Sequence, residues 1–585
     1  MIKKTILLTA VMLSSALIAA TNDASVVLRE NLWPSLERIP DFQEHQIAAM
    51  TDEMGKKDFV RSEHRMPFVE WYKAPEKPNG ACMILISGGS YECCCDVGLV
   101  RRKWPKRFLE LGYHCVNLVY RTPRAKGKDC HLSAWQDGQR AVRLVRSKAK
   151  EYGFDPERIG AIGMSAGGHL ATMLATSALT PSYEKVDSLD DLPCHINLAI
   201  CKAPAYNTLT ASSGIARPED GTLFLDSLKV SAKFAFDAKT CPISFHHGGK
   251  DPYTPNGSTL CYRALRKMKV PTELHLYSDK GHGAYGLERA VEFMRQLNFD
   301  GKLGKATERR IYTGQFTERT ERVDLWSGVK MPSAFSIHTN APYLTWYVPK
   351  ELKTKAIQII FPGGGYFHCN ASGEGLPVAE YFNKKGMTAV VVNYRVPRPP
   401  KGFAKHHVAW IDAQRAVRLV RSSAPARGLD PERIGAMGFS AGGHLTLMVS
   451  LSSTYNAYAP VDNIDRTTSC RVQWACPIYP AYALTDGSEC PNTTGGNDDG
   501  AVHVEEFLFD VNAPAMCFLH GDADGWAAMN SVKTWERLRR MGVQCDLHTL
   551  AKRGHCFQFV ASDGTGSATW LDRVWDFLLT KGFNK

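Results

Sequence analysis

The sequence has few of the features that mark membrane-embedded, metal-dependent or nucleic-acid-binding proteins. Beyond residue 20, no apolar run reaches the length of about eighteen residues that a membrane-spanning helix needs. Three adjacent cysteines, Cys93 to Cys95, cannot easily converge on one ion, and no Cys-x-x-Cys partner or histidine pair stands at ligand spacing. No basic tract is interleaved with aromatic residues. We therefore expect a protein without a metal, a cofactor or a nucleic acid partner.

The composition supplies enough apolar material for large packed cores. Of the 585 residues, 44% are hydrophobic and 10% are aromatic, which excludes a disordered chain and indicates two large domains or several smaller ones. The formal net charge of +12 comes from basic residues that are scattered along the chain, a pattern typical of a solvated surface. The charge alone therefore identifies no partner.

The first twenty residues, MIKKTILLTAVMLSSALIAA, predict a secretory signal peptide. Lys3 and Lys4 precede an apolar run of about sixteen residues that ends in small residues near Ala20. The alternative is a single membrane anchor, for which the run is short. We expect a periplasmic or secreted protein with no membrane span once residues 1–20 are removed. Its seventeen cysteines are an odd number, so at least one thiol is free or pairs with another molecule, and the pairing of any disulfides cannot be deduced.

Most of the chain is one sequence unit written twice. SGGSY recurs as PGGGY, AWQDGQRAVRLVRS as AWIDAQRAVRLVRS, and DPERIGAIGMSAGGHL as DPERIGAMGFSAGGHL, each at an offset of 275 residues. A polar and charged stretch between the two copies has the composition of a linker. The sequence leaves open whether the two domains pack on each other. The predicted segments are a signal peptide at 1–20, a first domain at 21–299, a linker at 300–324 and a second domain at 325–585.

Each half alternates short apolar runs with helical patterns. ACMILIS and AIQIIFP are followed by glycines and are typical of buried strands, and HCVNLVY and TAVVVNY supply the next strands. The duplicated segment around RAVRLVRS has apolar residues at helical spacing. This alternation predicts an α/β fold for each half, a mostly parallel sheet with helices on both faces. Sites in such sheets gather at the carboxyl ends of the strands.

Both halves contain a serine, an acid and a histidine in the same order. The pentapeptide Gly-x-Ser-x-Gly places the serine on a sharp turn between a strand and a helix. A serine hydroxyl becomes nucleophilic when a histidine takes its proton and a carboxylate orients that histidine. The acids follow the serines by 86 and 84 residues, and the histidines follow the acids by 31 residues in both halves. The predicted catalytic residues are Ser165, Asp251 and His282 in the first half and Ser440, Asp524 and His555 in the second.

A glycine-rich loop upstream of each serine is suited to bind an oxyanion. The developing negative charge needs two or more backbone N–H donors, and glycine lets the backbone approach the substrate closely. The residue after the serine offers another N–H group. The predicted donors are Gly88, Gly89 and Ala166 in the first half and Gly363, Gly364, Gly365 and Ala441 in the second. Aromatic side chains nearby are candidates for stacking on a sugar ring, with core packing as the alternative, namely Tyr91, Tyr366 and Trp526.

These motifs together resemble the carbohydrate-esterase branch of the α/β-hydrolases, specifically bifunctional feruloyl and acetyl xylan esterases. PGGGY, NYRVPR, DAQRAVRLVR, DPERIG-x-x-G-x-SAGGHL and HG-x-x-D carry the resemblance once per half, over nearly the whole mature chain. It implies metal-free removal of acetyl, or sometimes feruloyl, esters from plant cell-wall polysaccharides, and it assigns the same six catalytic residues. Acetylated polysaccharide or oligosaccharide is the expected substrate.

Each half departs from the family pattern at one position. Ser90 stands where the second half has its third glycine, Gly365, which alters the oxyanion loop if that position needs a positive φ. Cys556 follows His555 where glycine is expected, so its side chain can crowd or reorient the ring. Neither change removes a reacting group. We expect both halves to be active. The glycine-rich loop that donates N–H groups to the oxyanion, called the donor loop below, is more complete in the second half (363–365) than in the first (88–90).

Two other duplicated pairs of polar residues are expected to be structural. Asp137 and Asp412 lie in the duplicated helix and are predicted to make structural hydrogen bonds. His169 and His444 lie one helical turn after the serines, where a role in helix packing is expected rather than catalysis. Neither pair is therefore assigned to the reaction.

The segments where a lid would lie, between each serine and its acid, are polar rather than amphipathic. An open polar entrance favours a hydrophilic substrate with a small acyl group over a lipid. The alternatives are a lipase or a peptidase of the same fold, or a carbohydrate-binding protein on an inactive hydrolase fold. No propeller repeat of the kind found in prolyl oligopeptidases precedes either half. Binding alone places no demand on a serine, an acid and a histidine in both halves.

Overall fold

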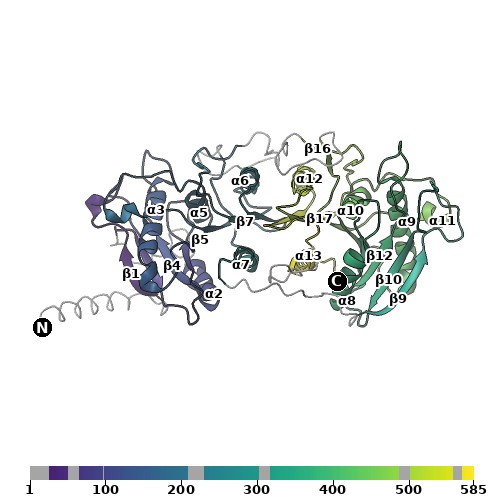
Figure 1. Cartoon of the computed structure of the whole chain (residues 1–585), viewed down its shortest axis with the longest axis horizontal. Coiled ribbons are helices and arrows are strands. Elements are labelled where there is room, and N and C mark those ends of the chain that lie inside the picture. Colours follow the sequence, from purple (N-terminus) through teal and green to yellow (C-terminus); the bar gives the residue numbers. More distant parts are fainter. Residues whose placement is uncertain are drawn as a thin grey trace. The chain divides into compact units, whose positions relative to one another are not determined.

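The chain forms two compact units, Met1–Leu303 and Gly304–Lys585 (Figure 1). We describe it from a computed structural model. The predicted signal peptide lies outside the described residues, as do parts of the predicted linker and of the two segments between serine and acid. The structure describes residues 26–50, 65–95, 98–208, 229–301, 317–485, 501–526, 528–557 and 569–584.

The first unit is built on a mixed sheet. Its strands lie in the spatial order β1-β2-β4-β3-β5-β6-β7-β8. β2 is antiparallel to both of its neighbours, and the strands from β4 through β8 in this order are parallel. The strands are β1 (Val26–Asn31), β2 (Phe68–Tyr72), β3 (Cys82–Ile86), β4 (His114–Val119), β5 (Ile159–Met164), β6 (Leu198–Lys202), β7 (Ile243–Gly248) and β8 (Thr272–Tyr277).

The second unit repeats this sheet in the order β9-β10-β12-β11-β13-β14-β17-β18. Here β10 is antiparallel to both of its neighbours, and the strands from β12 through β18 in this order are parallel. The strands are β9 (Thr317–Asp324), β10 (Tyr343–Pro349), β11 (Ile357–Phe361), β12 (Thr388–Asn393), β13 (Ile434–Phe439), β14 (Trp474–Ile478), β17 (Ala515–Gly521) and β18 (Cys545–Leu550), with a short hairpin of β15 (Leu484–Thr485) and β16 (Val502–His503).

Helices cover both faces of each sheet. In Figure 1, α6 (Asn256–Lys267) and α7 (Leu287–Gln296) lie on opposite sides of β7, and α12 (Met529–Arg540) and α13 (Thr569–Lys581) lie on opposite sides of β17. The predicted fold class, two tandem α/β units with mostly parallel sheets, is confirmed. The other main helices are α2 (Trp104–Glu110), α3 (Leu132–Ser147), α5 (Ala166–Thr176), α8 (Leu376–Lys384), α9 (His407–Ser423), α10 (Ala441–Leu451) and α11 (Asn463–Thr467).

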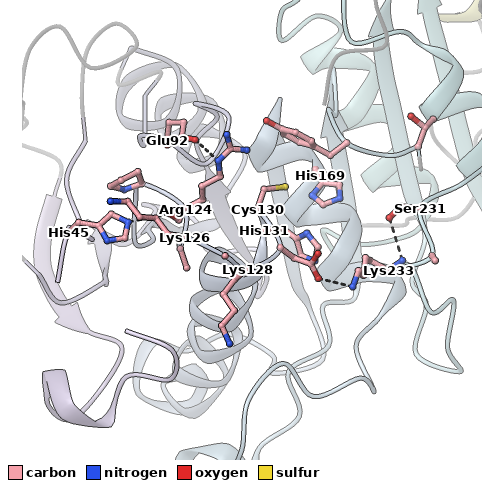
Figure 2. A pocket seen from close by; sticks show the side chains of 17 residues that line it. His45, Glu92, Arg124, Lys126, Lys128, Cys130, His131, His169, Ser231 and Lys233 are labelled. Atoms are coloured by element: carbon pink, nitrogen blue, oxygen red, sulfur yellow. Dashed lines mark hydrogen bonds and ion pairs between the residues drawn. The ribbon is translucent and has the colours of Figure 1, made fainter. Parts of the chain in front are cut away.

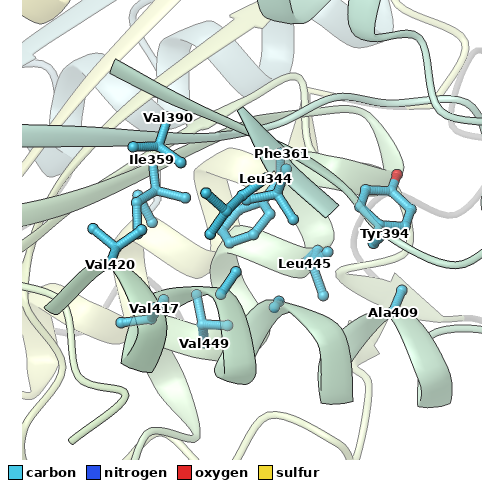
Figure 3. Packing of buried hydrophobic residues seen from close by; sticks show 14 of the residues in the cluster. Leu344, Ile359, Phe361, Val390, Tyr394, Ala409, Val417, Val420, Leu445 and Val449 are labelled. Carbon is cyan, nitrogen blue, oxygen red and sulfur yellow. The ribbon is translucent and has the colours of Figure 1, made fainter. Parts of the chain in front are cut away.

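The core of the second unit shows why these segments fold as they do. Successive side chains of β11 point to opposite faces of the sheet, so Ile359 and Phe361 join one apolar cluster and Ile360 joins another. Figure 3 shows the first cluster, in which Val417 and Val420 of α9 pack beneath the sheet. The three-residue spacing of these valines places them on one face of the helix. A strand that is buried on both faces reads as the continuous apolar run seen in the sequence.

The predicted linker, 300–324, is too long at its C-terminal end. Thr317–Asp324 forms β9, which pairs antiparallel with β10 along its length. The segment has a composition typical of a linker because it is an edge strand, where charged side chains are common and protect the open edge. Val323 packs against the apolar cluster of the second unit, which ties the strand to the sheet.

A buried ion pair recurs at the same place in both units. Arg121 contacts Asp137 at 2.9 Å and Arg395 contacts Asp412 at 2.8 Å, and all four side chains are fully buried. The indole N–H of Trp326 also donates to Asp412, at 2.8 Å. The predicted structural role of Asp137 and Asp412 is confirmed, since each carboxylate joins its helix to the loop after β4 or β12.

Replacing Asp412 by alanine is expected to lower the free energy of unfolding of the second unit by about 3–5 kcal/mol, because it leaves the Arg395 guanidinium buried without its carboxylate. Urea unfolding of the full chain, followed by tryptophan fluorescence, measures the change. The control is Asp324→Ala, which removes a carboxylate from an ion pair whose two side chains are 57% and 59% exposed. That pair should contribute less than about 1 kcal/mol. Equal effects of the two substitutions would contradict the prediction.

The sixteen cysteines among the described residues form no disulfide, and most of them are buried. Burial raises the pKa of Cys94 and of Cys369 to about 12, so both thiols are protonated and unreactive at neutral pH. Both act as small buried side chains rather than nucleophiles. Within the part of the chain that the structure describes, every helix is too short or too polar to cross a bilayer.

Candidate active site

Each predicted nucleophile sits on a strained turn at the carboxyl end of a central strand. Ser440 lies between β13 and α10 with φ 53° and ψ −117°, and Ser165 lies between β5 and α5 with φ 56° and ψ −120°. Positive φ is unfavourable for serine and is held by the surrounding structure. A Cβ atom on Gly438 would lie 2.1 Å from the carbonyl oxygen of Gly442. The two glycines of the pentapeptide therefore make this turn possible.

The second unit brings its serine, acid and histidine into one hydrogen-bonded chain. His555 Nε2 lies 2.7 Å from Ser440 Oγ, and His555 Nδ1 lies 2.7 Å from Asp524 Oδ2. The serine comes from the start of α10, the acid follows β17 and the histidine follows β18. An imidazole placed in this way can accept the serine proton while the carboxylate stabilises the resulting imidazolium.

The first unit assembles only part of the same chain. His282 Nδ1 lies 2.8 Å from Asp251 Oδ2. Among the described residues, no hydrogen bond joins His282 to Ser165, whose hydroxyl is largely buried. The ring of Tyr253 lies 4.9 Å from the ring of His282. Catalysis by this unit therefore needs a movement of the imidazole towards the serine, as can happen when substrate binds.

A second histidine holds each acid, and the sequence analysis missed it. His520 Nε2 lies 3.1 Å from Asp524 Oδ2, and its Nδ1 lies 2.8 Å from Ser531 Oγ. His247 repeats this arrangement in the first unit, with Nε2 3.2 Å from Asp251 Oδ2. Both histidines are fully buried. The signal in the sequence is a histidine four residues before each acid, within the repeated HG-x-x-D motif.

These contacts keep the acids ionised. Burial raises the pKa of the Asp524 carboxyl, but hydrogen bonds from His520 and His555 outweigh it and hold that pKa well below its usual value. The same balance, with His247 and His282, lowers the pKa of Asp251. The backbone N–H of Trp526 also donates to Asp524 Oδ1, at 2.8 Å. The carboxylate is thus available as an anion over the whole range in which imidazole titrates.

Two backbone N–H groups in each unit are available to an oxyanion. In the described part of the chain, the N–H groups of Gly364 and Ala441 have no hydrogen-bond partner, and the same is true of Gly89 and Ala166. Ala441 and Ala166 are the first residues of α10 and α5, so their N–H groups lack an intrahelical acceptor. These two pairs are the donors that the geometry supports best, and Gly88 stays a prediction.

Gly363 is a correction to the predicted oxyanion hole. Its N–H donates to Glu374 Oε2 at 2.5 Å, so it is not open to a substrate. The Tyr479 hydroxyl donates to the other oxygen of Glu374 at 2.9 Å, and the carboxyl side chain is buried. A Cβ atom on Gly363 would lie 2.8 Å from Glu374 Oε2 and 3.1 Å from Ser440 Cβ. Glu374 therefore fixes the donor loop beside the nucleophile.

Replacing Glu374 by glutamine is expected to lower kcat of the second unit about tenfold with little change in KM. The substitution weakens a charge-assisted hydrogen bond to Gly363, which is worth about 1.5–3 kcal/mol at most, and loosens the loop that carries Gly364. Hydrolysis of 4-nitrophenyl acetate by the Ser165→Ala chain, with and without Glu374→Gln, measures the change. Glu351→Gln, at a carboxylate that is 77% exposed, is the matched control. An unchanged kcat would show that the loop needs no such anchor.

The third position of the donor loop lies in the left-handed region in both units. Gly365 has φ 63° and Ser90 has φ 56°. A serine in this region carries about 1–2 kcal/mol of strain that glycine avoids. The position therefore needs a positive φ, and Ser90 adopts the required backbone at some cost in stability.

Tyr91 and Tyr366 are buried, so their rings are not open to stack on a sugar, which favours the alternative of core packing over the predicted substrate contact. Each side chain is 1% exposed and its hydroxyl meets a histidine, His169 Nδ1 at 2.7 Å and His444 Nδ1 at 2.8 Å. Both histidines are buried. The expected packing role of His169 and His444 is confirmed, and the two tyrosines join the donor loops to α5 and α10.

Other aromatic rings lie beside His555 and His282, the histidines that contact the acids. Trp526 is half-buried, with its ring 6.1 Å from that of His555 and 5.0 Å from that of Tyr482. In the first unit, Tyr253 takes the place of Trp526, and its ring lies 6.5 Å from that of Tyr206. The sequence analysis missed Tyr206 and Tyr482, although both follow the shared dipeptide Pro-Ala after the strand beside the serine.

Cys556 has φ 59° and is exposed, next to His555. Although the residue as a whole is exposed, partial burial of its thiol and the nearby Glu374 and Asp524 carboxylates raise its pKa to about 11, so it is not a thiolate at neutral pH. The hydrogen bond between Ser440 and His555 forms next to Cys556, so this side chain does not turn the imidazole away from the serine.

Among the described residues, no group of three or more His, Cys, Asp or Glu side chains is arranged to hold a metal ion.

Two stretches of the chain, residues 69–260 and 344–533, match the BD-FAE family, and together they make up more than half of the sequence. The first stretch includes Ser165 and Asp251, and the second includes Ser440 and Asp524. The duplication seen in the sequence is thus also a duplication of the family domain.

Individual relatives resemble one stretch of the chain at a time. An acetylxylan esterase of Xylanibacter ruminicola is 27% identical over 222 residues, 36% of this chain and 43% of the relative. Esterase LipQ of Mycobacterium tuberculosis is 29% identical over 206 residues, 32% of this chain and 46% of the relative. The chain thus spans less than half the length of these relatives. The acetyl ester-xyloside bifunctional hydrolase of Caldicellulosiruptor lactoaceticus is 27% identical with a TM-score of 0.38, over 47% of this chain and 100% of the solved chain.

Proposed function

The chain belongs to the BD-FAE family, which it matches in both halves, and from this premise we propose that it is a serine esterase. The reacting groups of the second unit are Ser440, His555 and Asp524, and those of the first are their counterparts Ser165, His282 and Asp251. The observation that carries the proposal is the contact of one imidazole with both a serine hydroxyl and a carboxylate at 2.7 Å. Binding alone gives no reason for this arrangement on a strained turn.

The geometry supports an acyl-enzyme mechanism. His555 Nε2 takes the proton of Ser440 as its oxygen attacks the ester carbonyl, and the Gly364 and Ala441 N–H groups stabilise the oxyanion. Asp524 stabilises the imidazolium, which then protonates the departing alcohol. A water molecule, activated by the same imidazole, releases the acid and restores the serine.

We assign the substrate as acetylated, and secondarily feruloylated, plant cell-wall polysaccharide or oligosaccharide outside the cytoplasm. Three observations support this assignment. A curated relative is an acetylxylan esterase. The cavity beside the first nucleophile is lined largely by charged and polar side chains, which do not suit a lipid tail. The N-terminal residues have the pattern of an export signal.

Acetate release from acetylated xylan tests the proposal directly. The mature chain should release acetate and hydrolyse 4-nitrophenyl acetate, and the Ser165→Ala/Ser440→Ala chain should do neither. A wild-type chain that turns over neither substrate would overturn the esterase proposal. A chain that turns over 4-nitrophenyl acetate but leaves xylan acetylated would overturn only the choice of polysaccharide.

A further inference from the structure

The two units have cavities at equivalent positions, each lined by the histidine that lies one helical turn after the nucleophile. The first-unit cavity has a volume of about 620 Å³ and the second about 440 Å³. Two buried histidines and a tyrosine line each of them. These are His131, His169 and Tyr206 in the first unit, shown with their neighbours in Figure 2, and His406, His444 and Tyr482 in the second.

Tyr206 connects the first-unit cavity, which it lines, to the neighbourhood of the nucleophile. The backbone N–H of Ala205 donates to the carbonyl oxygen of Ser165 at 3.2 Å, which places the following Tyr206 directly beside the nucleophile. The Tyr206 hydroxyl reaches the carbonyl oxygen of Ser90, in the donor loop, at 3.4 Å. Tyr206 therefore lies between the serine turn and the cavity, on a path that is open to the part of a substrate beyond its ester.

The buried histidines add no charge to either cavity. Burial lowers the pKa of His131 and of His406 to about 4, and it lowers the pKa of His169 and His444 well below the usual value. All four are therefore neutral at pH 7. The charge of each cavity is set by the Lys, Arg, Asp and Glu side chains that line it.

The first-unit cavity is positively charged. Four basic side chains face two acidic ones, a net charge of +2. One of the basic groups, Lys128, is paired at 3.1 Å with Asp41, which lies outside the lining. The charged lining residues are Arg124, Lys126, Lys128, Lys233, Glu92 and Asp129.

Lys126 carries the uncompensated charge of this cavity. Arg124 contacts Glu92 at 2.5 Å and Lys233 contacts Asp129 at 2.7 Å, as the dashed lines of Figure 2 show. Among the residues that the structure describes, no carboxylate lies within ion-pairing distance of the Lys126 ammonium group. This ammonium group is exposed and is placed to receive an anion from solution.

The second-unit cavity has the opposite charge. Glu505 and Glu506 face a single lysine, Lys405, whose ammonium group lies 4.2 Å from the centre of the Tyr482 ring. The lining therefore has a net charge of −1. The volumes differ as well, so the two cavities diverge while the serine turns beside them stay almost identical.

One structural position reverses its charge between the units. Lys233 precedes Phe234, whose ring lies 5.4 Å from that of His169, and Glu506 precedes Phe507, whose ring lies 5.2 Å from that of His444. Matching backbone hydrogen bonds support this equivalence. The N–H group of Ser231, two residues before Lys233, donates to the carbonyl oxygen of Asn207, which follows Tyr206. The N–H group of Val504, two residues before Glu506, donates to the carbonyl oxygen of Ala483, which follows Tyr482. Lys233 and Glu506 are thus equivalent wall residues of opposite sign.

We propose that the two units divide ester substrates by charge: the first takes acylated saccharides that carry a carboxylate near the ester, and the second takes neutral ones. A uronic acid substituent is the carboxylate that fits a saccharide of this class. The inference rests on the proposed esterase function and deepens it. The net positive lining of the first unit, where Lys126 is uncompensated and Lys233 is already paired with Asp129, attracts the anion, and the net negative lining with Glu505 and Glu506 repels it in the second.

The test isolates each unit in the full chain. The Ser440→Ala chain reports on the first unit and the Ser165→Ala chain on the second. The substrates are an acetylated xylo-oligosaccharide and the same oligosaccharide with one glucuronic acid substituent, compared at low salt. We expect the first unit to favour the acidic substrate in kcat/KM by about fivefold, and the second to favour the neutral one. Both preferences should weaken in 0.5 M salt, because exposed charges are screened.

Charge-reversal variants identify the wall residue. Lys233→Glu in the Ser440→Ala chain should abolish the preference for the acidic substrate, and Glu506→Lys in the Ser165→Ala chain should create one. Lys150→Glu, an exposed lysine outside the cavity, has the same charge change and should leave the ratio unaltered. Loss of activity on both substrates in equal measure would indicate a structural role for Lys233 and overturn the inference.

If the first unit turns over neither oligosaccharide, its affinity for the two oligosaccharides tests the charge inference instead. Calorimetry on the Ser165→Ala/Ser440→Ala chain should show tighter binding of the acidic oligosaccharide, and Lys233→Glu should weaken it about fivefold. Equal affinity for both oligosaccharides, unaffected by Lys233→Glu, would overturn the charge inference and leave the esterase proposal standing. Failure of the wild-type chain to hydrolyse 4-nitrophenyl acetate would instead overturn the esterase proposal.

Discussion

Replacing Ser440 by alanine is expected to remove most of the proposed ester-hydrolysing activity of the chain. The second unit has its serine, imidazole and carboxylate already in contact, whereas the first has no hydrogen bond between His282 and Ser165. Without its nucleophile the second unit should lose at least about 10⁴-fold in kcat, because the three groups act together. The activity left in the Ser440→Ala chain is that of the first unit. It is expected to be a minor share of the total on 4-nitrophenyl acetate.

The matched variant is Ser165→Ala, which should leave most of this activity in place. Ser→Ala keeps the turn and removes one oxygen atom, so both variants should unfold at nearly the wild-type temperature. The double variant should show no rate above that of buffer. A larger loss in Ser165→Ala than in Ser440→Ala would contradict the ranking of the two sites.

Replacing Asp524 by asparagine in the Ser165→Ala chain is expected to lower kcat by about 10⁴-fold while KM changes little. The amide cannot stabilise the imidazolium, and it favours the wrong tautomer of His555. The control is Asp324→Asn, at an exposed carboxylate of the same unit, which should retain wild-type kcat. A loss of less than tenfold in a folded Asp524→Asn chain would show that the carboxylate is not part of the reaction.

The Asp524 carboxyl also shapes the pH dependence of activity in the Ser165→Ala chain. Hydrogen bonds from His520 and His555 hold its pKa below the usual value, in spite of burial, so it stays ionised throughout the range in which imidazole gains a proton. The stabilisation that it provides is present above its unfolded pKa and is lost only as the pH falls through its folded pKa. The kcat of this chain, measured against pH, should therefore show no loss from protonation of Asp524 over this range.

The sequence predicts which three side chains meet in the second unit because parallel strands end at one edge of the sheet. The serine, the acid and the histidine each follow a strand, and Ser440, Asp524 and His555 meet although more than a hundred residues separate the first from the last. Family membership also confirms the predicted resemblance to carbohydrate esterases. The ends of strands and the order of motifs are local patterns, so they can be recognised in the amino-acid sequence alone.

Other features depend on contacts between distant residues and were not predictable. The donor role of Gly363 is lost because Glu374, eleven residues away, takes its N–H. Tyr366 follows the donor loop in the sequence, but its ring turns inward to meet His444. The edge strand β9 has the composition of a linker because an edge strand pairs with a single neighbour and tolerates many charged residues. The charges at Lys233 and Glu506 belong to segments outside the shared motifs.

The two units are parts of one polypeptide, and this covalent continuity sets their stoichiometry. Every molecule made contains one copy of each, whatever the level of synthesis, so the ratio of the two specificities is fixed at translation. A polymer that is bound by one unit presents its remaining esters to the other at an effective concentration rather than at its bulk concentration. A polymer that contains both charged and uncharged sugars carries substrates for both units, so one molecule of the protein can act on both kinds of ester along it.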